Sequence, residues 1–208
     1  MKKTKRSKKS RSWVIKQHRD QFFKKSKVLG YRSRSAFKLI ELNKKFNFLK
    51  NNSNLVDVGC SPGGWSQVSR NIVKLGKIVS IDIKTMENIN GVHFIQEDFQ
   101  SDTTKDKILK FLNNKIDVII SDMAADTTGN RNLDCIRTNA LCSDVLNFST
   151  RILKKRGTVI AKLFMGEDFL TVKNLAKRRF EKVEFFKPES SRNESKETYI
   201  HCSSLKTL

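Results

Sequence analysis

From residue 54 onward, short apolar runs alternate with longer stretches whose apolar residues recur at helical spacing. The runs rich in β-branched and aromatic residues, which predict strands, are Leu55–Val58, Lys77–Ile81, Val92–Ile95, Ile116–Ile120, Thr158–Ala161, Val183–Phe186 and Thr198–Cys202. The stretches that predict helices are Trp65–Leu75, Lys105–Asn113, Leu133–Leu153 and Glu167–Phe180. This alternation predicts an α/β fold, with a mostly parallel seven-stranded sheet and helices on both faces. Only a short turn separates the last two strands, so we expect them to pair antiparallel.

The segment before this pattern is polar and basic. Residues 1–12 carry charge and no core-forming residues, so we expect a flexible basic arm there, followed by a single domain over residues 13–208. Within the domain, we expect a helix capped by Ser33 or Ser35, with Phe37, Ile40 and Phe46 on its apolar side.

Charge is concentrated at the start of the chain. The 208 residues carry a formal net charge of +21. Residues 1–50 hold 18 Lys or Arg but only two acidic residues, Asp20 and Glu41. A block of this sign attracts polyanions, which favours nucleic acid as the partner over an anionic membrane or a merely solubilising tail. We expect no membrane association, because no apolar run approaches the ~18 residues that span a bilayer.

Nothing in the sequence indicates export or a metal site. No signal peptide follows the basic start, and residues 2–12 lack the apolar residues that an amphipathic transit peptide needs. The four cysteines are scattered, without zinc-ligand spacing. We therefore expect a cytoplasmic monomer with reduced thiols and no metal.

The first predicted strand leads into a glycine-rich loop and then a helix. Gly59, Gly63 and Gly64 in this loop permit backbone to approach a ligand, although an ordinary tight turn has the same composition. The dinucleotide fingerprint G-x-G-x-x-G fails because position 61 is Ser, which disfavours a nicotinamide oxidoreductase. Trp65, which follows the loop, either packs on a ligand or belongs to the core.

Acidic residues follow the next two strands. Asp82 ends the second strand, 23 residues after Gly59, where a carboxylate can accept hydrogen bonds from ribose hydroxyls. Asp98 follows the third strand and can accept from an adenine amino group. Carboxylates suit a nucleoside without phosphates, so S-adenosylmethionine is the cofactor that we expect.

Two charged residues end strands that should be buried. Asp122 follows the fourth strand and Lys162 the fifth, and such residues are rarely buried without a partner or a function. Methyl transfer to a ribose hydroxyl needs a base, and a neutral Lys162 would serve if desolvation and a neighbouring cation, Lys38, lowered its pKa. Asp122 would then orient the amine. By periodicity alone Lys38 and Glu197 are unremarkable.

The sequence resembles the FtsJ-like family of ribosomal RNA 2′-O-methyltransferases over nearly its whole length, from Ser12 to Ile200. The matching segments are Arg32–Leu39, Asp57–Gly59, Pro62–Gln67, Ser121–Ala124, Lys162–Phe164, Gly166–Glu167, Lys187–Pro188, Ser190–Arg192 and Glu197–Ile200. The resemblance implies a Rossmann-like methyltransferase fold that uses S-adenosylmethionine. It also implies a uridine substrate in large-subunit ribosomal RNA, within the assembled 50S subunit.

The resemblance also assigns roles to residues. The family's catalytic Lys-Asp-Lys-Glu tetrad falls on Lys38, Asp122, Lys162 and Glu197, with Lys162 as the proton acceptor. Its cofactor contacts fall on Gly63, Trp65, Asp82, Asp98 and Asp122. One departure follows the catalytic aspartate: the family usually reads Met-Ala-Pro-Asn, whereas this chain has Met-Ala-Ala-Asp at residues 123–126.

Two other functions remain open at this point. A non-catalytic ribosome-assembly factor would use the basic arm without the tetrad. A related 2′-O-methyltransferase would act on tRNA or an mRNA cap instead of ribosomal RNA.

Overall fold

The computed structural model describes residues 20–113 and 116–206. The expected arm at residues 1–12 lies outside this part of the chain. The strands are β1 (Leu55–Val58), β2 (Ile78–Asp82), β3 (His93–Gln96), β4 (Ile116–Ser121), β5 (Leu153–Phe164), β6 (Phe180–Phe186) and β7 (Glu197–Leu205). The helices are α2 (Gln21–Val28), α3 (Ser35–Phe46), α4 (Gly64–Ile72), α5 (Asp102–Leu112), α6 (Arg131–Ile152) and α7 (Phe169–Arg179).

The seven strands form one sheet in the order β3-β2-β1-β4-β5-β7-β6. β1 pairs parallel with both β2 and β4, and β5 continues the parallel part. β7 enters between β5 and β6 and runs antiparallel to both. The predicted α/β architecture with antiparallel pairing at its end is therefore confirmed. The carboxyl ends of β1, β2, β4 and β5 consequently meet at one edge of the sheet.

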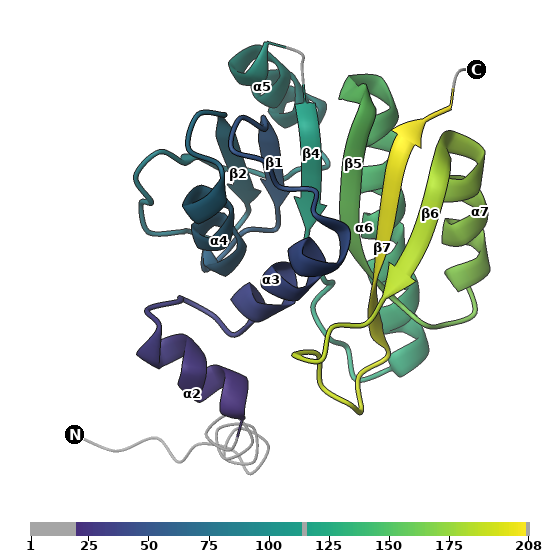
Figure 1. Ribbon diagram of the computed structural model, residues 1–208. Helices are drawn as coiled ribbons and strands as arrows, with labels where there is room; N and C mark the ends of the chain where they lie inside the picture. Colours follow the sequence, from purple (N-terminus) through teal and green to yellow (C-terminus); the bar gives the residue numbers. More distant parts are fainter. Residues whose placement is uncertain (1–19, 114–115, 207–208) are drawn as a thin grey trace.

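Helices cover both faces of the sheet (Figure 1). Alternate residues of β1 point to opposite sides: Val56 and Val58 pack with residues of α5, α6 and α7 in one core cluster. Leu55 packs with residues of α3 and α4 in the other. Two buried faces explain why the central strands read as continuous apolar runs.

The first helices differ from the sequence prediction. Helix α2 lies at residues for which the sequence predicted no helix or strand, and Asp20 caps it by accepting hydrogen bonds from the amides of Phe22 and Phe23. The predicted serine cap of α3 is wrong, because Arg34 holds that position without a side-chain cap bond. Ile40 is 36% exposed, so its predicted place on the apolar side is also wrong.

The buried face of α3 consists of Ala36, Phe37, Leu39 and Leu42. Among the described residues, no helix combines the length and apolarity that crossing a bilayer would need. The four cysteines are buried and unpaired thiols.

Candidate active site

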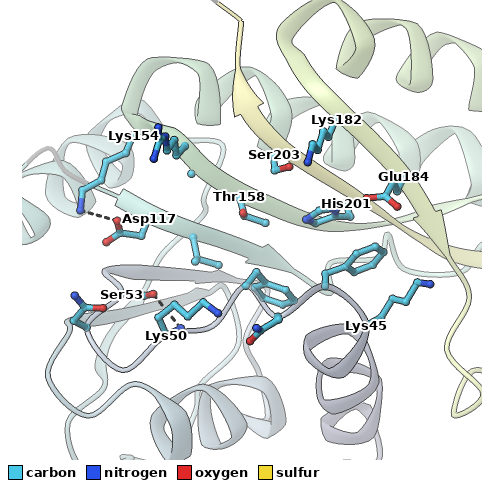
Figure 2. A pocket seen from close by; sticks show the side chains of 17 residues that line it. Lys45, Lys50, Ser53, Asp117, Lys154, Thr158, Lys182, Glu184, His201 and Ser203 are labelled. Atoms are coloured by element: carbon cyan, nitrogen blue, oxygen red, sulfur yellow. Dashed lines mark hydrogen bonds and ion pairs between the residues drawn. The ribbon is translucent and has the colours of Figure 1, made fainter.

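Two cavities lie at opposite edges of the sheet. The larger, of about 660 Å³, is at the amino ends of β4 and β5 and contains none of the predicted site residues (Figure 2). The other, of about 580 Å³, is at the carboxyl ends and is lined by Asp82, Asp98 and Asp122. Ligands of open α/β sheets bind at the carboxyl ends of the strands. The second cavity is therefore the candidate for a small ligand, and we call it the carboxyl-edge cavity.

The carboxylates of Asp82, the last residue of β2, and Asp98, which follows β3, are fixed by backbone amides. Asp82 accepts hydrogen bonds from the amides of Ser61 at 2.9 Å and Lys84 at 2.8 Å, one on each oxygen. Asp98 accepts one from the amide of Gln100 at 2.9 Å. Each carboxylate oxygen has two lone pairs, so both groups keep free acceptor sites while their orientation is set.

The glycine-rich loop passes close to neighbouring groups. Gly59 has φ +76°, and a Cβ there would lie 2.4 Å from Cγ of Met123. Gly63 has φ +112°, and its Cβ would lie 2.8 Å from Nη1 of Arg32. A positive φ and this crowding both require glycine. Gly59 lines the carboxyl-edge cavity, whereas Gly63 is not among the lining residues.

The ring of Trp65 belongs to the core. Trp65 is the second residue of α4, and its side chain is 2% exposed and donates a hydrogen bond from Nε1 to the carbonyl of Ser35 at 2.8 Å. The ring centroid is 5.7 Å from that of Tyr199. The sequence left a ligand contact and a core position open for this ring, and the structure places it in the core. Trp65 does not line the carboxyl-edge cavity.

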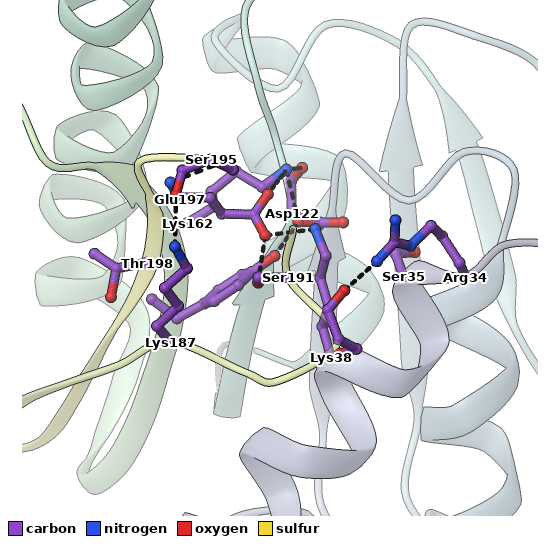
Figure 3. Close-up of polar contacts among 12 residues, drawn as sticks. Arg34, Ser35, Lys38, Asp122, Lys162, Lys187, Ser191, Ser195, Glu197 and Thr198 are labelled. Carbon is purple, nitrogen blue, oxygen red and sulfur yellow. Dashed lines mark hydrogen bonds and ion pairs between the residues drawn. The ribbon is translucent and has the colours of Figure 1, made fainter. Parts of the chain in front are cut away.

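The four residues of the predicted tetrad lie together although they come from α3, β5, β7 and the end of β4 (Figure 3). Nζ of Lys162 is 2.7 Å from Oδ1 of Asp122 and 3.7 Å from Oε2 of Glu197. It also donates to the backbone carbonyl of Asp122 at 2.8 Å. Nζ of Lys38 is 2.6 Å from Oε1 of Glu197. Two amines and two carboxylates thus form one nearly buried, charge-balanced cluster.

Mutual attraction favours the charged forms of Lys162, Asp122 and Glu197. Burial lowers the pKa of Lys162, but the carboxylates of Asp122 and Glu197 raise it by more, so the net pKa lies above the ordinary value. Burial raises the pKa of Asp122, but Lys162 and Lys38 lower it by more. The same balance lowers the pKa of Glu197. The expectation of a depressed Lys162 pKa is therefore wrong for this cluster, because two carboxylates outweigh desolvation.

Tyr199 and Ser191 complete the cluster, and the sequence prediction did not assign them a role. The hydroxyl of Tyr199 donates to Oδ1 of Asp122 at 2.6 Å, and Ser191 donates to Oε1 of Glu197 at 2.7 Å. Tyr199 pairs directly with Lys162 across β5 and β7. Tyr199 follows Glu197 by two residues in a strand, so the side-chain alternation placed both on one face. Only the register showed that this face is that of Lys162.

Side chains of the α3 region hold the loop between β6 and β7. The carboxylate of Glu41 accepts hydrogen bonds from the amides of Glu189 at 2.6 Å and Ser190 at 3.1 Å. Arg34 contacts both the carboxylate of Asp20 and the carbonyl of Ser190. This loop carries Ser191 toward Glu197. We call these contacts of Glu41 and Arg34 the loop clamp.

A further acidic residue, Asp57 of β1, lies fully buried beside the glycine-rich loop. Its Oδ2 accepts a hydrogen bond from Ser66 at 2.6 Å, while Oδ1 has no partner in the described part of the chain. Burial raises the pKa of Asp57 to about 7, with smaller contributions from Asp122 and Asp82 and an opposing one from Ser66.

The departure from the family motif lies at the cavity wall. Ala125 and Asp126 both line the carboxyl-edge cavity. Asp126 is exposed, and its carboxylate is 3.9 Å from Nζ of Lys84. Within residues 20–113 and 116–206, no group of three or more His, Cys, Asp or Glu is arranged to hold a metal ion.

Comparison with known proteins relates the chain to methyltransferases. A family described as FtsJ-like methyltransferase matches residues 31–205. Ribosomal RNA large subunit methyltransferase E of Pelagibacter ubique is 44% identical over 197 residues, covering 95% of this chain and 97% of the relative. The Rickettsia akari protein of the same name is 41% identical over 202 residues, covering 94% and 89%.

Solved structures share the fold. One described as a ribosomal RNA methyltransferase from Plasmodium falciparum has a TM-score of 0.75 and 35% identity, covering 84% of this chain and 98% of that chain. Human methyltransferase-like protein 13 in complex with SAH has a TM-score of 0.59 and 16% identity, covering 81% of each chain, which shows the fold alone. The fold is that of S-adenosylmethionine-dependent methyltransferases. With most of its length matched, this chain belongs to the FtsJ-like methyltransferase family.

Proposed function

We infer that the protein methylates the 2′-hydroxyl of a uridine ribose in large-subunit ribosomal RNA, in the assembled subunit, with S-adenosylmethionine as the methyl donor. Relatives named as ribosomal RNA large subunit methyltransferases support the substrate class. The observation that carries the proposal is the nearly buried amine of Lys162, 2.7 Å from an Asp122 carboxylate that also lines the carboxyl-edge cavity. We expect the protein to act in the cytoplasm on the ribosomal substrate that its relatives' names indicate. We also expect a monomer, because all four tetrad residues belong to one chain.

The donor set of the cavity fits S-adenosylmethionine. Asp82 and Asp98 keep free acceptor sites for the ribose hydroxyls and the adenine amino group. The glycine-rich loop lets backbone approach the ligand at Gly59, and the predicted contacts of Gly63 and Trp65 would come from the backbone that begins α4. When bound, the cofactor supplies an electrophilic methyl group on a sulfonium cation.

The tetrad would position and deprotonate the attacking hydroxyl. Lys162 accepts the proton, Asp122 and Glu197 hold its amine, and Lys38 balances the charge of Glu197 at 2.6 Å. The Lys162 ammonium must first release its own proton to solvent, because the lowered pKa values of Asp122 and Glu197 disfavour transfer to either carboxylate. A sulfonium cation bound in the carboxyl-edge cavity would also interact with the Asp122 carboxylate. This competition would weaken the stabilisation of the Lys162 ammonium and lower the pKa of Lys162.

The experiment offers unmethylated 50S subunits, naked 23S ribosomal RNA and tRNA to the purified protein with radiolabelled S-adenosylmethionine. We expect label in the 50S subunits, and mass spectrometry of the digested RNA should place it on a uridine ribose. Label in tRNA alone would overturn the substrate. Equal labelling by the wild type and the Lys162→Arg variant would overturn the assignment of the base.

A further inference from the structure

The cavity at the amino ends of the strands, which we call the amino-edge groove, has no part in the chemistry above. It occupies about 660 Å³ between the end of α3 with the loop that follows it and the amino ends of β4 and β5. Residues of β6 and β7 form its remaining wall (Figure 2). Thr158 of β5 lines the groove and Lys162 of the same strand belongs to the tetrad, so the two sites are four steps along the strand apart, about 13 Å.

The groove is lined by an excess of positive charge. Five basic residues and two acidic ones line it, namely Lys45, Lys50, Lys154, Arg156 and Lys182 with Asp117 and Glu184. Lys154 pairs with Asp117 at 2.6 Å. Within the described part of the chain, the other four basic side chains form no ion pair. The carboxyl-edge cavity has the opposite balance, with four carboxylates and two basic residues. The two edges of the sheet therefore attract ligands of opposite charge.

Hydrogen-bond donors accompany this charge. Thr158 and Ser203 are paired residues of β5 and β7, and both hydroxyls line the groove. The side-chain amides of Asn47 and Asn52 lie on the opposing loop. Lysine, arginine, hydroxyl and amide groups are the side chains that contact phosphate oxygens in nucleic-acid complexes.

The two phenylalanines of the groove, Phe46 and Phe48, are already occupied. Phe48 is 7% exposed and packs in a core cluster. The ring of Phe46 stacks on His201, with centroids 4.1 Å apart and planes 10° apart. A ring held in this way is not free to stack on an unpaired base, which is the usual means of gripping single-stranded bases. The groove therefore offers contacts to a phosphate backbone and not to bases.

We propose that the amino-edge groove binds the phosphodiester backbone of RNA, as a second contact on the face of the molecule away from the tetrad. Figure 2 shows Lys45 and Lys50 on the wall formed by α3 and its loop, with Lys182 on the strand wall opposite. Cations on separate walls suit a chain of phosphates better than a single anion. The inference rests on the proposed function only in taking RNA as the substrate.

The test compares two variants that remove the same charge. The groove variant carries Lys50→Gln, Arg156→Gln and Lys182→Gln. The control variant carries Lys110→Gln, Lys177→Gln and Arg178→Gln, which are exposed residues of α5 and α7, helices on the other face of the sheet. Filter binding to a 23S ribosomal RNA fragment over a range of salt concentrations gives Kd. Binding of S-adenosylmethionine by calorimetry checks that both variants are folded.

For the groove variant we expect Kd to rise about tenfold at about 0.1 M salt. The slope of log Kd against log salt should fall by about 2, since each phosphate contact contributes about 0.7 to 0.9. The control variant should change much less, and the turnover of the groove variant at saturating RNA should match the wild type. Equal effects in both variants would overturn the groove as a specific site.

Three further outcomes separate the explanations. Unchanged binding of naked RNA with weakened binding of intact 50S subunits would overturn the RNA backbone in favour of a ribosomal protein. If the wild type binds and methylates ribosomal RNA but the groove variant binds like the control, only the groove inference fails. If the wild type transfers no methyl group but the groove variant still loses RNA affinity selectively, the proposed function fails and the groove remains.

Discussion

Lys162 shows how a single side chain is constrained by its surroundings. Its amine is nearly buried, yet two carboxylates within 3.7 Å keep it protonated in the structure. Removing one partner of a buried ion pair leaves the other charge uncompensated and costs about 3–5 kcal/mol. Replacing the lysine with another long cationic side chain keeps the charges of the cluster balanced. Charge and proton transfer can therefore be tested separately at this position.

The Lys162→Arg variant should fold and bind S-adenosylmethionine but lose methyl transfer. Arginine keeps the positive charge beside Asp122 and Glu197, and its pKa, above about 12, prevents it from accepting a proton. Lys162→Ala should lose both activity and stability, since it leaves two buried carboxylates short of a cation. Single-turnover labelling and thermal unfolding measure the two effects. Substantial activity in the arginine variant would contradict a base at residue 162.

The rate of methyl transfer should rise with pH. Only the neutral amine of Lys162 can accept a proton, and its raised pKa makes that form scarce at neutral pH. Below the apparent pKa, each pH unit should raise the single-turnover rate about tenfold. The measurement is single-turnover labelling across neutral and alkaline pH with saturating RNA and cofactor. A rate that stays constant over this range would rule out this titration.

Asp57 should make the protein less stable as pH rises from about 4 to about 7. Its pKa is about 7 in the folded chain against an ordinary value of 3.8, so the folded state holds this proton more tightly. The contribution of Asp57 to the free energy of unfolding is fully present below pH 3.8, the ordinary pKa. It is lost as pH rises through the pKa of the folded chain, by about 4 kcal/mol at most.

The Asp57→Asn variant tests this contribution, because its side chain does not titrate. Denaturant unfolding at several pH values gives the difference in unfolding free energy between wild type and variant. As pH rises from about 4 to about 7, the unfolding free energy of the variant should increase relative to that of the wild type. A difference that is independent of pH would show that Asp57 is not protonated in the folded chain.

At the scale of elements, α3 connects the tetrad to the loop between β6 and β7. Arg34, Lys38 and Glu41 lie near one side of this helix, at spacings of four and three residues. Lys38 contacts Glu197, while the loop clamp of Glu41 and Arg34 holds the backbone that presents Ser191. One helix face thus fixes both the cation and the loop.

The Glu41→Ala variant should loosen this loop. It removes the acceptor of two backbone amides, and charge-assisted hydrogen bonds contribute about 1.5–3 kcal/mol each. We expect a lower Tm, faster proteolysis between residues 187 and 196, and a kcat reduced about tenfold with an unchanged KM for S-adenosylmethionine. Glu41→Gln, which keeps one acceptor oxygen, should recover part of kcat. If kcat is unaffected while the loop is cleaved faster, the loop clamp has no influence on the tetrad.

At the scale of the whole molecule, acidic and basic side chains gather at opposite edges of the sheet. The carboxyl edge holds the acidic cavity, the amino edge holds the basic groove, and the sequence adds the basic residues of 1–12. With the proposed ligands, this separation would let one chain attract a cationic cofactor and a polyanionic RNA without direct competition between the two.

Deleting residues 2–11 should weaken RNA binding and flatten its salt dependence, because each Lys or Arg that contacts a phosphate adds to the counterions released. Cofactor affinity should stay the same. The measurement is filter binding of the truncated and full-length chains over a salt series. An unchanged affinity at low salt would show that the arm does not contact RNA.

The sequence by itself determined the order of strands and helices, since periodicity and β-branched runs are local properties that survive in any α/β packing. It also singled out Asp122 and Lys162, because charges at the ends of buried strands are unusual in any fold. Lys38 and Glu197 were reached only through the family resemblance, because their spacing is that of ordinary surface charges. Tertiary structure decided the rest: the register of β5 against β7 placed Tyr199 beside Lys162, and two carboxylates reversed the expected pKa shift. These effects depend on distances between residues far apart in the chain, which local patterns do not encode.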